Sequence, residues 1–187
     1  MKKTTYAATA VVFLALMAAC NDAPKTIAEA TPSEAAVRIR TMEDSLYAHP
    51  AVEVKGAQAL VDVYLLYAKT NPTDPLAPEY LLRAAGVKSA LHDPQAAVEL
   101  YDRIIKGYPN WDKAVDAYYL RAFTIDSGLH LKGLAQQAYQ EVIDRYPDHK
   151  FAADAKQMIL NLNYTDEELV AKFQRMNDST EAAAAAK

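Results

Sequence analysis

The sequence contains few of the residues that build covalently linked or tightly turned scaffolds. Cysteine occurs once in 187 residues, so no disulfide can form within the chain. Glycine occurs five times, which leaves little material for phosphate-cradling loops or for a β-rich fold with many tight turns. With Lys+Arg 20 against Asp+Glu 24, the chain also lacks the excess of positive charge that nucleic-acid-binding proteins carry. We therefore expect no disulfide scaffold and no nucleic-acid partner.

Apolar residues, in contrast, are abundant: they make up 51% of the chain, against 24% for charged residues. This composition is ample for a hydrophobic core and excludes disorder over the whole chain. The length fits one domain. No segment shows the sustained alternation of apolar and polar residues that is typical of strands. The composition and patterning predict a mostly helical, mildly acidic protein.

Residues 1–19 have the layout of a secretory signal peptide, with two lysines near the start and then an apolar run too short to span a membrane. Cys20 follows directly after Met17-Ala18-Ala19. This order resembles the lipobox of bacterial lipoproteins, in which the cysteine is acylated and the signal is cleaved before it. The alternative is a plain signal peptide followed by an incidental cysteine. We expect cleavage before Cys20 and a lipid anchor on its thiol.

The residue after this cysteine bears on the location of the protein. In the enterobacterial pattern, an aspartate at that position retains a lipoprotein in the inner membrane, and Asn21 is not that signal. The resemblance therefore implies a lipid-anchored protein of the outer membrane, and we expect it on the periplasmic face. Loss of the two N-terminal lysines leaves 18 basic against 24 acidic side chains. Such a surface has no long-range attraction for anionic lipid headgroups.

The composition divides the rest of the chain into three parts. Residues 20–32 mix Pro, Thr, Ala and single charges without periodicity, so we expect a linker behind the lipidated cysteine. Residues 33–176 contain helical runs separated by prolines and are the expected helical domain. Residues 177–187 include a run of alanines at the end of the chain, where we expect a flexible tail.

Two capping patterns mark where helices begin within this domain. Asp93 precedes Pro94, which combines a capping acid with proline at the first helical position. Thr165 and Glu168 have the spacing of a capping box. The expected helices cover residues 33–48, 55–71, 76–91, 94–107, 112–127, 131–146, 150–162 and 166–176.

The helical region contains an internal repeat of 38 residues, the separation of Tyr80 from Tyr118. A fixed period of this size indicates stacked units of helical hairpins, because none of them can bury its apolar face alone. We therefore expect an all-α fold, an α-solenoid of about four such hairpins. The matched pairs are Tyr80/Tyr118, Leu82/Leu120, Arg83/Arg121, Ala84/Ala122, Ser89/Ser127, Leu91/Leu129, Ala97/Ala135, Tyr101/Tyr139, Ile105/Ile143, Tyr108/Tyr146 and Pro109/Pro147.

The second half of each unit resembles the tetratricopeptide-repeat (TPR) family. Its motif is a small residue, an aromatic, an aliphatic and a proline, found as Ala97/Tyr101/Ile104/Pro109 and Ala135/Tyr139/Val142/Pro147. The small residue lets two helices approach, the aromatic fills the groove between them, and proline ends the second helix. We expect repeat packing from Ala97, Tyr101, Pro109, Ala135, Tyr139 and Pro147.

A longer pattern, Tyr-Pro-x4-Ala-x2-Ala at residues 108–117 and 146–155, is similar to envelope lipoproteins of one TPR branch. That branch includes the TPR lipoprotein of the outer-membrane β-barrel assembly machine and the periplasmic coordinator of the Tol–Pal system. The resemblance covers residues 57–176. It implies a TPR-like adaptor that binds a protein or peptide partner and takes part in outer-membrane assembly or maintenance.

Four residues are candidates for contact with that partner: Tyr80, Arg83, Tyr118 and Arg121. They lie at helical spacing in the first helices of two consecutive hairpins, which by the TPR resemblance line a concave binding face. A repeated arginine can fork onto a carboxylate of a partner. The alternative is that the arginine stems only cover the helix surface and that the tyrosines belong to the core.

Arrangements typical of enzymes are hard to find in this sequence. The four histidines are widely spaced and none belongs to an H-E-x-x-H pair. Cys20, the only thiol, is used by the expected anchor. We expect no enzyme, and therefore no catalytic residue, metal site or cofactor. Two alternatives to an adaptor stay open: a structural subunit that self-associates, and a carrier or enzyme acting on an envelope glycan or peptide.

Overall fold

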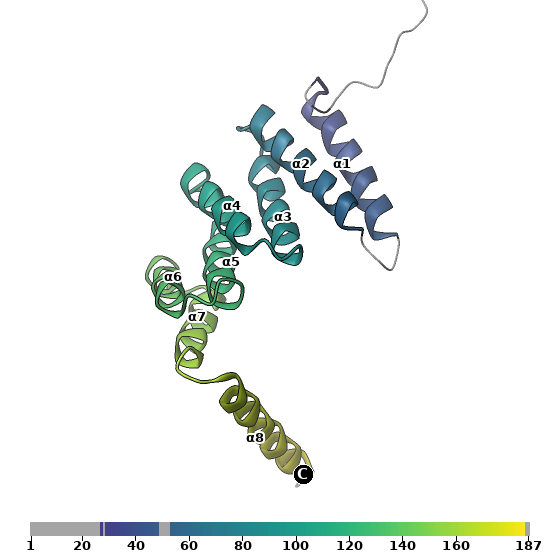
Figure 1. The fold of residues 1–187 in the computed structure, drawn as a ribbon. Helices are drawn as coiled ribbons and strands as arrows, with labels where there is room; N and C mark the ends of the chain where they lie inside the picture. Colours follow the sequence, from purple (N-terminus) through teal and green to yellow (C-terminus); the bar gives the residue numbers. More distant parts are fainter. Residues whose placement is uncertain (1–26, 28, 49–52, 186–187) are drawn as a thin grey trace, which may run out of the picture.

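The computed structural model describes residues 27, 29–48 and 53–185, which form eight α-helices and no β-strand (Figure 1). The expected all-α fold is confirmed. Cys20 and the expected signal peptide lie outside the described residues. The helices are α1 (Pro32–Tyr47), α2 (Val54–Thr70), α3 (Leu76–Ala90), α4 (Pro94–Gly107), α5 (Ala114–Ser127), α6 (Lys132–Arg145), α7 (Lys150–Asn161) and α8 (Asp166–Ala185).

Helix α8 is the one element whose expected extent is wrong. The sequence analysis ended this helix at residue 176 and expected a flexible tail from residue 177, but the helix continues to Ala185. Its last turns contain a run of alanines, the residue with the highest intrinsic helix propensity. The other helix ends lie within about two residues of the expected ones, which is the usual spread of helix boundaries.

Both expected capping patterns form. The Oδ1 atom of Asp93 accepts a hydrogen bond from the N–H of Ala96 at 3.2 Å, and Pro94 occupies the first turn of α4. At the start of α8, the carboxylate of Glu168 accepts from the N–H of Thr165 at 2.8 Å, and the Thr165 hydroxyl accepts from the N–H of Glu168 at 3.2 Å. These bonds satisfy backbone donors that a helix N-terminus otherwise leaves without partners.

Each helix from α1 to α6 packs on the next helix in the sequence, and α5 also contacts α7. Figure 1 shows this succession along the molecule, with α8 extending away from the other helices. The arrangement is that of an all-α, solenoid-like repeat, in which a unit touches only its neighbours. None of the helices in the described part of the chain is long and apolar enough to cross a membrane.

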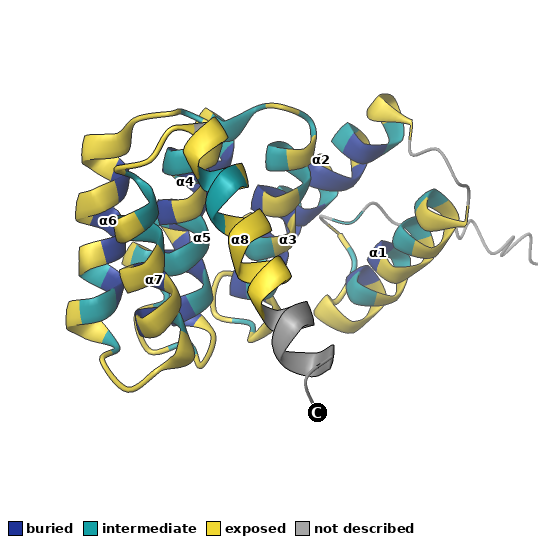
Figure 2. Ribbon diagram, turned by 90° about the horizontal axis from the view of Figure 1, so that it is seen from below, coloured by how far each residue is buried: buried dark blue, intermediate teal, exposed yellow. Residues whose placement is uncertain are grey.

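The repeat positions of the sequence occupy the contacts between these helices. Ala97, Tyr101, Ala135 and Tyr139 are at most 2% exposed, and Figure 2 shows the buried residues on the helix faces that meet. The two prolines of the motif differ from them: they are exposed and follow the residues that cap the C-terminal ends of α4 and α6. Pro109 and Pro147 therefore stand where the second helices end, outside the buried contacts.

The repeat is also visible in the backbone. His92 and His130, which are separated by the same 38 residues, both have positive φ angles, of 59° and 55°. His92 lies between α3 and α4 and His130 lies between α5 and α6, each two residues before the second helix of its hairpin. Two consecutive hairpins thus use the same left-handed residue to reverse the chain.

Candidate partner-binding surface

Two open cavities lie beside α3, and Gly86 lines both of them. The cavity between α1 and α3 has a volume of about 510 Å³, and its walls include Asp44 and Tyr47. The cavity between α3 and α5 has a volume of about 620 Å³, and its walls include Leu120 and Phe123. Because the cavities adjoin at Gly86, they form one groove across the first helices of three hairpins. We call it the α1–α3–α5 groove.

The walls of the groove carry two exposed aromatic side chains. Tyr47 on α1 is 59% exposed and Phe123 on α5 is 42% exposed. Each belongs to one of the two cavities that meet at Gly86. Exposed aromatic residues are enriched in protein interfaces, because they bury a large area at a small cost in conformational entropy. The groove therefore offers apolar contact area to a partner.

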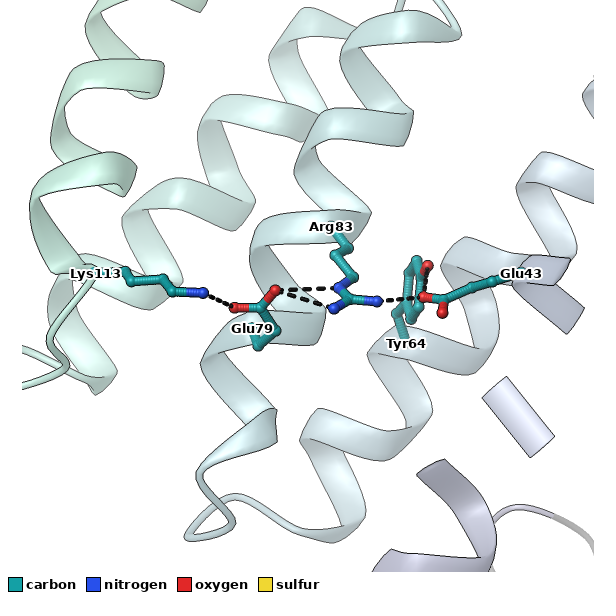
Figure 3. A network of polar contacts seen from close by, with 5 residues as sticks. All are labelled: Glu43, Tyr64, Glu79, Arg83 and Lys113. Carbon is teal, nitrogen blue, oxygen red and sulfur yellow. Dashed lines mark hydrogen bonds and ion pairs between the residues drawn. The ribbon is translucent and has the colours of Figure 1, made fainter. Parts of the chain in front are cut away.

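A network of charged and polar groups lies next to the α1–α3 cavity (Figure 3). Arg83 on α3 donates to Glu43 on α1 at 2.7 Å and to Glu79 on its own helix at 3.2 Å. The phenol of Tyr64 donates to Glu43 at 2.6 Å, and Lys113 donates to Glu79 at 2.9 Å. The network links α1, α2, α3 and the start of α5, so it connects three consecutive hairpins.

The pKa values in this network follow from its contacts. Burial acts to raise the pKa of Glu79, but the hydrogen bonds from Lys113 and Arg83 outweigh it and hold that pKa below its usual value. Burial and the hydrogen bond to Glu43 raise the pKa of Tyr64 well above its usual range. Glu79 is thus favoured as a carboxylate acceptor and Tyr64 as a protonated donor.

The pKa shifts of Glu79 and Asp126 have opposite signs, so we expect their contributions to stability to change in opposite directions as the pH is lowered. The pKa of Glu79 is lowered, so its stabilising contribution is present above its unfolded value of about 4.3 and is lost as the pH falls through the folded value. Burial raises the pKa of Asp126, so its contribution to stability is present below its unfolded value of about 3.9 and is lost as the pH rises.

This difference can be measured with Glu79→Gln and Asp126→Asn by urea unfolding between pH 7 and pH 3. The free energy of unfolding of the parent minus that of Glu79→Gln should shrink as the pH is lowered. The same difference for Asp126→Asn should change in the opposite direction. Parallel pH dependences for the two variants would contradict these assignments.

A second ion-pair network surrounds α5. Arg121 donates to Asp102 on α4 at 2.9 Å and also to Glu141 on α6. Glu141 in turn accepts from Arg145 at 2.9 Å. The guanidinium of Arg121 also lies over the ring of Tyr118, 5.5 Å from its centroid. Since the Arg121 side chain is only 14% exposed, this network belongs to the contact between helices.

The structure separates the four candidate partner-binding residues. Tyr80 and Tyr118 are each 5% exposed and lie in the core. Arg83 keeps 44% of its side chain exposed, whereas Arg121 is largely buried. Both guanidiniums already pair with carboxylates of this chain, so a partner's carboxylate would compete with these pairs. Partner binding by these residues stays a prediction.

Sequence reasoning missed the residues that line the groove. Gly86 stands inside a helical run, and such an isolated glycine is a signal that could have been followed. Tyr47 and Phe123 give no such signal, because an aromatic residue in an amphipathic helix is equally typical of the core. Their exposure depends on how α1, α3 and α5 are spaced, which involves three separate hairpins.

Within the residues that the structure describes, no group of three or more His, Cys, Asp or Glu side chains could hold a metal ion. The fold and the groove define this chain as an all-α, solenoid-like repeat protein. No protein-family model matches the chain, and no curated protein is significantly similar to it.

Proposed function

We propose that this chain is a membrane-anchored adaptor of the tetratricopeptide-repeat type that binds a partner protein in the bacterial cell envelope. The observation that carries the proposal is the α1–α3–α5 groove, which presents Tyr47 and Phe123 on the first helices of the first and third hairpins. The repeated small-aromatic-aliphatic-proline motif supports the TPR assignment. The site of action is the outer membrane, in its assembly or maintenance.

The anchor and the groove fit together in this proposal. The lipobox-like segment before Cys20 supports attachment of the chain to a membrane through acyl chains. A tethered groove meets a partner in the same membrane at a raised effective concentration, so a modest affinity is sufficient. Adaptor function therefore requires no deep, enclosed pocket, and the two cavities of the groove are open.

Site-specific photo-crosslinking in intact bacterial cells that produce the full-length chain tests the adaptor function. A benzophenone amino acid replaces Tyr47 or Phe123 in the groove, and Leu134 on α6, which is 52% exposed and does not line the groove, is the control position. We expect one discrete adduct of the same partner from both groove positions and none from Leu134. Equal adducts from all three positions, or none from the groove, would refute the adaptor.

The same cells test the anchor. With Cys20→Ser, the chain should leave the membrane fraction and change its electrophoretic mobility, because neither acylation nor the cleavage that follows it can occur. A variant that stays membrane-bound with unchanged mobility would refute the lipid anchor while leaving the groove experiment to stand on its own.

A further inference from the structure

Gly86 lies in the interior of α3, at a position where the fold gives no reason for glycine. A Cβ atom added there meets nothing within 4 Å, and the φ angle is not positive. The repeat does not require glycine either, since the residue 38 positions later in α5 is Thr124. Glycine inside a helix destabilises it relative to alanine. The chain therefore carries a destabilising residue that its own packing does not need.

The absence of a side chain at Gly86 leaves the groove open at the point where its two cavities meet. Gly86 is exposed and belongs to the walls of both cavities. A larger residue here would project a side chain into the groove where the two cavities meet. Glycine on a helix surface instead permits the close approach of another backbone. The groove thus has an open crossing point over α3.

The charges that line the groove indicate the chemistry of its occupant. No Lys, Arg, Asp or Glu side chain of the described residues lines the α3–α5 cavity. In the α1–α3 cavity, Glu43 and Arg83 pair with each other. The side chain of Asp44 has no hydrogen bond or ion pair with another described residue, and it lines the same cavity. The uncompensated charge of the groove is therefore negative.

We propose that the groove binds an extended segment of the partner protein that carries an apolar side chain and, a few residues away, a lysine or arginine. The segment crosses α3 with its backbone over Gly86. Its apolar side chain enters the α3–α5 cavity beside Phe123, and its cation reaches Asp44. Charge complementarity of this kind gives specificity more than affinity. This inference rests on the proposed adaptor function and adds the chemistry of the segment that is bound.

Fluorescein-labelled peptides of nine residues, with one Leu and one Lys in an Ala/Ser background, provide the test. The set varies the separation of Leu and Lys from one to five residues, and matched peptides carry Glu in place of Lys. Binding to the purified full-length protein in detergent is followed by fluorescence anisotropy. At the best separation, we expect the Lys peptide to bind at least tenfold more tightly than the Glu peptide. Equal affinity for the Lys and Glu peptides, or no binding of either peptide at millimolar concentrations, overturns the proposal.

Two substitutions assign the binding to the groove. Gly86→Leu should weaken the Lys peptide at least tenfold, whereas Gly133→Leu, at a glycine of α6 that also has nothing within 4 Å of an added Cβ, should leave it unchanged. Asp44→Lys should reverse the preference from Lys to Glu. Circular dichroism checks that each variant keeps its helices. Unchanged affinity in Gly86→Leu, or an unchanged preference in Asp44→Lys, overturns the proposal.

A failure of this inference can be distinguished from a failure of the proposed adaptor function. Photo-crosslinks from the groove to one partner, combined with peptides that show no Lys preference, would leave an adaptor with a different bound segment. Absence of the crosslinks would refute the adaptor function itself.

Discussion

Replacing Tyr139 with alanine is expected to lower the free energy of unfolding by about 3–5 kcal/mol, the range measured for truncation of large buried aromatic residues. The side chain is 0% exposed and lies in the core cluster of α5, α6 and α7. Its ring lies 6.0 Å from that of Tyr119, measured between centroids. Domains of this size are stable by only about 5–15 kcal/mol, so the loss is a large part of the total.

Urea unfolding followed by circular dichroism measures this loss, and Tyr139→Phe is its control. The phenol of Tyr139 donates to Asp126 at 3.4 Å, which is long for an O–H···O hydrogen bond. Removal of the hydroxyl alone should therefore cost less than about 1 kcal/mol. A similar loss in both variants would show that the hydroxyl, and not the ring, carries the contribution of this residue.

The second large effect is expected at Arg121. Arg121→Ala should lower the free energy of unfolding by about 2–3 kcal/mol, because it leaves Asp102 and Glu141 without their shared partner inside a helix contact. The value is below the 3–5 kcal/mol typical of a fully buried pair, since these carboxylates are still 35% and 34% exposed and water screens them.

Arg83→Ala is the matched comparison. Arg83 is the repeat equivalent of Arg121, but its side chain is 44% exposed, so its ion pairs should contribute about 1 kcal/mol or less. Urea unfolding of both variants at the same salt concentration checks the difference. Equal losses would mean that the two arginines play the same structural part in spite of their different burial.

The sequence predicts most of the fold, because the determining signals are local. Proline after the second helix, the capping residues at Asp93 and Thr165, and the repeated small and aromatic positions all act within one hairpin. Helix α8 extends further than expected for an equally local reason, since the alanine run was interpreted by its position at the chain end and not by its helix propensity.

The two arginines show where sequence reasoning fails. In sequence they are equivalent, but the residue 38 positions before Asp102, the partner of Arg121, is Tyr64. Tyr64 offers no carboxylate and donates instead to Glu43, which then also pairs with Arg83. Partners on neighbouring hairpins decide the environment of each arginine, so a repeat of residue types does not imply a repeat of contacts.

The packing of each helix from α1 to α6 on the next helix in the sequence also bears on how the chain folds. Contacts between residues that are close in sequence need little loop closure, so folding is expected to be fast and can begin before the whole chain is present. Hairpins at the N-terminal end can form without the later ones, because each unit contacts only its neighbours. A hairpin that has folded exposes the face that the next hairpin will cover. Each new helix pair can therefore pack on a surface that is already formed.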